Sequence, residues 1–321
     1  MTESLPVEAL IPSIDRALAD AGCAVLVAEP GAGKTTVVPW RLAQSEWLAG
    51  GRIVMLEPRR IAARAAAARI AWHLGESVGE TVGYRVRFDS RISARTRIEV
   101  VTEGVLGRML ADDPSLERYR LVILDEFHER SVHADLALAL TLQARAVFRP
   151  DLRILVMSAT IDAPALAATL GGAPILSTPG RIHPIETRYR PPRPDQRLEQ
   201  AVAATIREAL AVDDGDILVF LPGVGEIRRV EELLAADPID AAVLPLHGTL
   251  SAAEQDAALA PARERRVILA TAIAETSLTV PSVRIVIDAG LMRVPRFSPR
   301  TGMTRLETVR GTKASADQRR G

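Results

Sequence analysis

The chain has a single cysteine and no long apolar run. Cys23 is the only cysteine among 321 residues, so no disulfide can form within the chain. No uninterrupted apolar segment approaches the roughly 20 residues that a membrane span needs, and the first residues lack a basic stretch followed by an apolar one. These absences predict a soluble protein of the reducing cytoplasm, with no secretory signal.

Aromatic residues and lysines are also scarce. Aromatic residues make up 3% of the chain, which argues against a protein that reads bases on aromatic platforms. Lys34 and Lys313 are the only lysines, so 38 of the 40 basic residues are arginine. The retention of lysine at position 34 points to a task that needs a compact ammonium group.

The balanced net charge of zero hides two local clusters of cations. Residues 85–97 carry five arginines against one acid, and residues 291–321 carry eight cations against two acids. Solvated loops would explain either cluster alone. Two of them in a chain with other signs of nucleotide handling favour binding of a nucleic acid strand.

Apolar runs of four to eight residues alternate with longer stretches of helical period, which predicts an α/β fold with mostly parallel sheets covered by helices. The segment 178–194 holds five prolines and has no helical period, so it is expected to be a linker. We predict a first domain over 1–177, a linker over 178–195 and a second domain over 196–321. The predicted strands are 23–29, 52–57, 97–102, 120–125, 153–160, 217–222, 241–247, 266–271 and 283–288.

The segment from Ala28 to Thr36, AEPGAGKTT, lies between an apolar strand and a helical stretch, as a surface-exposed phosphate-binding loop requires. Its glycines allow backbone N–H groups to surround phosphates at a helix N-terminus that favours anions. Lys34 would bridge the β- and γ-phosphate oxygens of ATP, and the Thr35 hydroxyl would bind Mg²⁺. The residues expected to bind nucleotide here are Gly31, Ala32, Gly33, Lys34, Thr35 and Thr36.

A pair of acids ends another predicted strand at Asp125 and Glu126, in the string DEFH. Ligands of open α/β sheets bind at the carboxyl ends of strands, so Asp125 would hold Mg²⁺ and Glu126 would take a proton from the attacking water. Alone, such a pair is often only a helix cap followed by an acid of the first turn. Together with the phosphate loop it indicates an NTPase site, with Thr35, Asp125 and Glu126 around the metal.

These motifs occur in the order and spacing of the DEAH/RHA-type helicases of superfamily 2, which the chain resembles over nearly its whole length. Phe127, LEPRR and FLPGVGEI are most similar to the bacterial HrpB branch of that family. The resemblance implies two tandem RecA-like P-loop NTPase domains, ATP and Mg²⁺ as cofactors, and a single strand of RNA or DNA as partner of a probable monomer. The motifs are GAGKT (31–35), EPRR (57–60), TEG (102–104), DEFHER (125–130), SAT (158–160), FLPG (220–223), AETSLT (274–279), RTGM (300–303) and SADQRRG (315–321).

The resemblance also implies roles for individual residues. Ser158 and Thr160 would couple hydrolysis to strand movement, His128 would link the acid pair to them, and Gln318 would help to place the water. Arg69 would stack on adenine, although a solvated helix arginine is the simpler interpretation. The residues that match strand-gripping positions are Arg59, Arg60, Arg87, Thr102, Gly104, Thr271 and Thr276.

The family's last motif continues beyond Gly321 with two arginines that reach the γ-phosphate, and further domains follow it. From this resemblance we expect the sequence to be cut within the last motif and to hydrolyse ATP slowly.

Two other interpretations are open at this point. A nucleotide-switched binding module would bind ATP and a strand but hydrolyse little. A metabolic P-loop kinase would have one domain with a lid rather than a second α/β half. The sequence does not choose between RNA and DNA, because that choice depends on contacts to the 2′-hydroxyl.

Overall fold

A computed structural model describes residues 5–29, 31–159, 162–178, 184–260, 262–275, 280 and 282–320. The chain divides into two compact units, Met1–His183 and Pro184–Gly321. The division falls within the predicted linker, and the described residues 184–195 carry no helix or strand. No helix among the described residues is long and apolar enough to cross a membrane.

The first unit is built on one eight-stranded sheet, in the order β4-β3-β5-β2-β6-β7-β1-β8. Every neighbouring pair is parallel except β3 and β4. The carboxyl ends of the parallel strands therefore meet at one edge. The strands are β1 (Cys23–Ala28), β2 (Arg52–Glu57), β3 (Val82–Val86), β4 (Asp89–Arg91), β5 (Ile98–Thr102), β6 (Tyr119–Leu124), β7 (Arg153–Ser158) and β8 (Ile175–Thr178).

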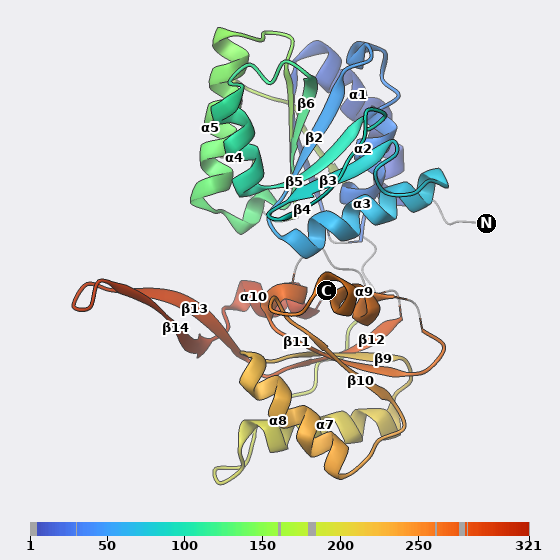
Figure 1. Cartoon of the computed structure of the whole chain (residues 1–321), viewed down its shortest axis with the longest axis vertical. Coiled ribbons are helices and arrows are strands. Elements are labelled where there is room, and N and C mark those ends of the chain that lie inside the picture. Colours follow the sequence, from blue (N-terminus) through green and yellow to red (C-terminus); the bar gives the residue numbers. More distant parts are fainter. Residues whose placement is uncertain are drawn as a thin grey trace. The chain divides into compact units, whose positions relative to one another are not determined.

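Helices cover both faces of this sheet (Figure 1). Successive strand residues point to opposite faces, so Ile53 and Met55 of β2 pack with α1, α2 and α3, whereas Val54 and Leu56 pack with α4, α5 and α6. The helices are α1 (Ile11–Asp20), α2 (Lys34–Leu42), α3 (Arg60–Leu74), α4 (Glu103–Asp112), α5 (Val132–Val147) and α6 (Ala163–Thr169), with 3₁₀ turns η1 (Pro6–Leu10), η2 (Glu46–Leu48) and η3 (Phe127–Glu129).

The second unit has a four-stranded parallel sheet in the order β10-β11-β9-β12. Helices α7 and α8 pack on one face, where Ile206 and Val230 meet Val219 and Leu269. Its elements are α7 (Leu198–Val212), β9 (Asp216–Phe220), α8 (Val224–Ala236), β10 (Ala242–Leu246), α9 (Ala252–Leu259), β11 (Arg266–Ala270), η4 (Ala272–Ala274), β12 (Val283–Asp288), β13 (Leu291–Ser298), β14 (Met303–Arg310) and α10 (Lys313–Arg320). Two tandem α/β domains with mostly parallel sheets are thus confirmed.

All nine predicted strands are present, but five further strands are not among the predictions. The cation-rich segment after residue 290, for which solvated loops were the simpler of two interpretations, forms the antiparallel hairpin β13–β14, with Leu291 paired to Arg310. Part of the other cation cluster lies in β3 and β4. These strands were missed because arginines interrupt their apolar alternation. Strand β8 also extends to Thr178, one residue into the predicted linker.

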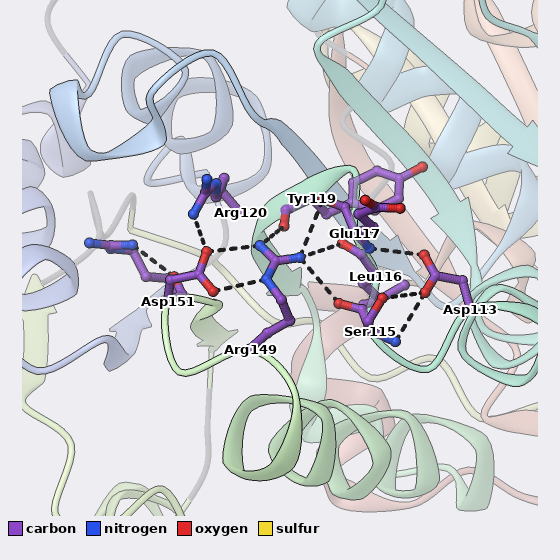
Figure 2. A network of polar contacts seen from close by, with 9 residues as sticks. Asp113, Ser115, Leu116, Glu117, Tyr119, Arg120, Arg149 and Asp151 are labelled. Atoms are coloured by element: carbon purple, nitrogen blue, oxygen red, sulfur yellow. Dashed lines mark hydrogen bonds and ion pairs between the residues drawn. The ribbon is translucent and has the colours of Figure 1, made fainter.

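A polar network holds the opposite edge of the first sheet, where β6 and β7 begin (Figure 2). Arg149 binds both carboxylate oxygens of Asp151, from Nε at 2.8 Å and Nη2 at 2.9 Å. It also donates to four carbonyl oxygens in the loop that leads into β6, those of Ser115, Leu116, Glu117 and Tyr119. One partly buried guanidinium therefore serves four backbone acceptors in and beside this loop.

Candidate nucleotide site and strand-facing edge

The predicted site residues of the first unit gather at the carboxyl edge of its sheet. Pairing of Val27 with Ser158 and of Leu124 with Val156 brings the ends of β1, β7 and β6 together. Pairing of Glu57 with Thr102 brings together the ends of β2 and β5. The residues predicted to bind nucleotide thus follow β1, β7 and β6, and the residues predicted to grip a nucleic acid strand follow β2, β5 and β3.

The phosphate loop turns sharply between β1 and α2. Gly31 and Gly33 have φ angles of +77° and +94°, values that side chains rarely tolerate, and Gly33 is the N-cap of α2. A Cβ on Gly33 would lie 2.9 Å from Cδ1 of Leu5, and the Val7 N–H donates to the Ala32 carbonyl at 3.1 Å. Turn η1 therefore supports the loop from behind. Thr36 lies in the first turn of α2.

Lys34 is less exposed than we predicted for a surface loop. Only 4% of the residue is accessible, and its ammonium donates to the carbonyl oxygens of Ala28 at 2.7 Å and Glu29 at 3.4 Å. Both acceptors belong to the same loop. The loop's own backbone thus holds the ammonium within the predicted phosphate-binding loop.

The hydroxyl of Thr35 donates to Oδ2 of Asp125 at 2.5 Å, which joins two motifs 90 residues apart. The other Asp125 oxygen accepts from the backbone N–H of Glu126 at 2.8 Å. These are hard oxygen donors of the kind that Mg²⁺ prefers, usually with few protein ligands and with substrate phosphate. Among the described residues no group of three or more His, Cys, Asp or Glu side chains is arranged to hold a metal.

The residue after this carboxylate has a strained backbone. Glu126 has φ of 49° and ψ of 36°, in the left-handed region that non-glycine residues seldom occupy. Its carboxylate lies 3.4 Å from Nδ1 of His128, and the backbone N–H of Ala159 lies 3.4 Å from the same nitrogen. Burial lowers the pKa of His128, so its imidazole is neutral near pH 7. His128 thus lies between the acid pair and the segment after β7.

Ser158 is fully buried at the end of β7, and its hydroxyl has no hydrogen-bond partner among the described residues. Thr160 lies outside the described residues.

A buried acid that we did not predict lies in the same region. Glu57 ends β2, has no exposed surface, and interacts with the carboxylate of Asp125. Burial, followed by the negative charges of Asp125 and Glu126, raises its pKa well above the ordinary value. An acid at the end of the otherwise apolar run RIVMLE was the sequence signal.

The strand-gripping candidates of the first unit lie on the β2–β5 side of the edge. Arg59 precedes α3 and donates to Oε2 of Glu129 at 3.2 Å, whereas Arg60 is exposed. Thr102 is the N-cap residue of α4, and nothing lies within 4 Å of a Cβ added to Gly104. The open surface at Gly104 leaves its backbone accessible to a ligand.

The cation cluster over 85–97 is not a continuous basic patch. Arg85 pairs with the buried Glu99 at 2.8 Å, and Arg95 pairs with Glu80 at 2.9 Å. Arg97 donates to the Gly51 carbonyl. Arg87 is exposed at the turn between β3 and β4, and its guanidinium lies 4.7 Å from the ring centroid of Phe88. Arg87 is therefore better placed than Arg85, Arg95 or Arg97 to contact a nucleic acid strand.

Arg69 is exposed on α3 and lies over the indole of Trp72, 4.4 Å from its centroid. Its cation–π contact in this structure is thus made with its own helix. The predicted contact with adenine remains a hypothesis.

In the second unit, Thr271 is the N-cap residue of η4, and Gln318 lies on α10. Thr276 lies outside the described residues. The neighbour of Gln318, Arg319, is buried and pairs with Glu275 at 3.1 Å and Asp288 at 2.7 Å. These contacts engage Arg319 inside the second unit and fasten α10 to the ends of β11 and β12.

A phosphate loop after one strand of a parallel sheet, joined through a threonine to an acid pair after another, defines a P-loop NTPase. Comparison with known proteins narrows this class. Residues 11–168 match the DEAD/DEAH box helicase model, and residues 200–321 match the helicase conserved C-terminal domain. The chain belongs to the DEAH/RHA family of helicases.

Individual relatives agree with this assignment. The chain is 50% identical over 99% of its length to the ATP-dependent RNA helicase HrpB of Escherichia coli K12. It is 40% identical to the ATP-dependent RNA helicase HrpA homolog of Haemophilus influenzae. A crystal structure of the E. coli DEAH/RHA helicase HrpB matches 99% of the chain with a TM-score of 0.89. The chain spans 40% of the length of this HrpB relative and 25% of that of the HrpA homolog.

Proposed function

We propose that this chain is the ATP-hydrolysing core of an RNA helicase, which couples hydrolysis in the first unit to movement along a single strand. The 2.5 Å contact between Thr35 and Asp125 carries this proposal, because it unites the phosphate loop with the acid pair. RNA is the proposed strand because the similar proteins are named RNA helicases.

Binding of ATP would begin with an exchange of partners at Lys34. Its ammonium would leave the carbonyls of Ala28 and Glu29 for the β- and γ-phosphate oxygens, and the N-terminus of α2 would favour the same anion. Thr35 and Asp125, beside Glu126, would hold Mg²⁺, which neutralises phosphate charge when bound.

Glu126 would then act as the general base for the attacking water. Its backbone N–H is anchored on Asp125, which supports a fixed position for its carboxylate. The neutral His128 would pass changes at this acid to the segment of Ser158 and Thr160. In the second unit, Gln318 would help to orient the water.

The RNA strand would lie against the carboxyl ends of β2 and β5. The residues that would contact its sugar-phosphate backbone are Arg59, Arg60, Arg87, Thr102 and Gly104. In the second unit Thr271 and Thr276 would make the equivalent contacts. Such contacts to phosphates and sugars carry little sequence preference. The cytoplasm remains the proposed compartment, since the lone Cys23 is a free, buried thiol.

The test is phosphate release with and without single-stranded RNA, in the parent and in Glu126→Gln. This variant should bind Mg·ATP as the parent does and lose turnover by about 10²-fold or more, since it removes the base while keeping its shape. Glu117→Gln, an exposed acid at the opposite edge of the sheet, should behave like the parent. Turnover by Glu126→Gln at the parent rate would contradict the assignment of the base.

A further inference from the structure

One ion pair crosses the boundary between the two halves of the carboxyl edge. Strands β2 and β6 are neighbours, with Leu56 paired to Leu124. Arg59 follows β2, on the side proposed to face the RNA. Glu129 ends the turn η3 that follows β6, on the nucleotide side. The 3.2 Å contact between Nη2 of Arg59 and Oε2 of Glu129 joins the two halves directly.

The pair is only partly exposed, with 26% of the Arg59 side chain and 20% of the Glu129 side chain accessible. The second oxygen of Glu129, Oε1, is buried and has no hydrogen-bond partner among the described residues. The charges of Asp125, Glu126 and Glu129 all act on Glu57, so Arg59 pairs with one member of a group of neighbouring acids. A strand phosphate would have to draw the guanidinium away from this carboxylate.

We propose that Glu129 is a positioning residue that competes with a strand phosphate for Arg59. Without a strand, Glu129 holds the guanidinium at the β2–β6 boundary. When a phosphate takes Arg59, Glu129 loses its cation beside the acid pair, so occupancy of the strand site changes the charge balance at the nucleotide site. The inference rests on the proposed function, because it takes Arg59 as a strand contact.

If Glu129 competes with RNA for Arg59, neutralising Glu129 should raise the affinity for RNA rather than lower it. Glu129→Gln keeps the shape of the side chain but no longer holds Arg59 as an ion, so it should tighten binding of RNA. A partly exposed ion pair of this kind corresponds to about a three- to ten-fold change in affinity. A residue with a merely structural role would weaken binding when altered.

The experiment measures the dissociation constant of a fluorescent single-stranded oligouridylate at one fixed salt concentration, without nucleotide. Asp135→Asn is the matched control. Asp135 lies six residues after Glu129 and forms an exposed ion pair with Arg130, so the substitution also removes one negative charge. The control should change affinity less than about two-fold. Thermal unfolding of each variant checks the fold. If Glu129→Gln does not fold, Glu129→Asp should tighten binding by a smaller factor.

A double-mutant cycle tests whether the effect passes through Arg59. Arg59→Ala should weaken binding by about three- to ten-fold, and adding Glu129→Gln to it should cause no further change. Equal tightening by Glu129→Gln with and without Arg59, or equal effects of Glu129→Gln and Asp135→Asn, would overturn the competition. Failure of the parent itself to bind RNA would instead overturn the proposed function.

Discussion

The ammonium of Lys34 donates to the carbonyl of Ala28 at 2.7 Å, so a residue at one end of the phosphate loop is held by the residue at the other. Lys34→Ala should lower the affinity for Mg·ATP by about 30-fold or more, because a buried charged contact to phosphate is lost. Lys313→Ala, which removes the only other lysine from the exposed face of α10, should leave nucleotide affinity unchanged. Titration with a fluorescent ATP analogue measures both, and equal affinities in all three proteins would refute the loop's assignment.

The arginines near β3 and β4 should differ in their effect on RNA. Arg87→Ala removes an exposed cation and should weaken RNA binding by about three- to ten-fold. It should also reduce the slope of log binding constant against log salt concentration by about one. Arg95→Ala removes a cation already paired with Glu80, so it should change affinity less than about two-fold. Titrations at several salt concentrations separate the two. Similar losses in both variants would mean that the whole cluster acts as a diffuse basic patch.

The network in Figure 2 offers a matched pair of arginines for measuring stability. Arg149 and Arg188 each bind both oxygens of an acid two residues away. Only Arg149 also satisfies the carbonyls of the loop before β6. Arg149→Ala should therefore lower the free energy of unfolding by about 2–3 kcal/mol, whereas Arg188→Ala should change it far less, because its ion pair is exposed to solvent. Denaturant unfolding gives both values when it is monitored in the first unit for Arg149→Ala and in the second unit for Arg188→Ala. Equal losses would show that the carbonyl contacts contribute nothing.

The same network predicts a dependence of stability on pH. The Arg149 hydrogen bonds lower the pKa of Asp151 from 3.8 to about 2. An acid whose pKa is lowered on folding stabilises the protein at pH values above its ordinary pKa, and this contribution disappears as the pH falls through about 2. The advantage of the parent over Asp151→Asn should be constant above about pH 5, amount to about 1 kcal/mol after solvent screening, and shrink below about pH 4. A difference that is constant down to about pH 2 would contradict this coupling.

The sequence predicted the central strands because their apolar runs are uninterrupted. RIVMLE and RLVILD have no Gly, Pro or internal charge, and both lie deep in the first sheet. Strands toward the β4 end of the sheet are different. VGYRV in β3 contains a glycine and an arginine, Arg85, whose charge is balanced by Glu99 on β5. Neither local propensity nor periodicity reports a partner 14 residues away, so such strands remain hidden in a single sequence.

The site was predicted in its motifs but not in its connections. A phosphate loop and an acid pair are local strings, and their chemistry follows from residue type. The pairing of Arg59 with Glu129 depends on β2 lying next to β6, which only the order of strands determines. The same holds for Glu57, whose environment depends on Asp125 from the neighbouring strand. Local patterns therefore name the candidate reacting groups, whereas the sheet topology determines their neighbours.

The alternation of β2 between the two core faces has an evolutionary consequence. A single-residue insertion within Arg52–Glu57 would turn Ile53 and Met55 toward the opposite helices and shift Arg59 away from Glu129. Such an insertion would damage two cores and the strand-facing edge in one event. Length variation among descendants of this gene should therefore accumulate in the connections at the amino edge of the sheet, such as residues 43–51, and be absent from the strand itself.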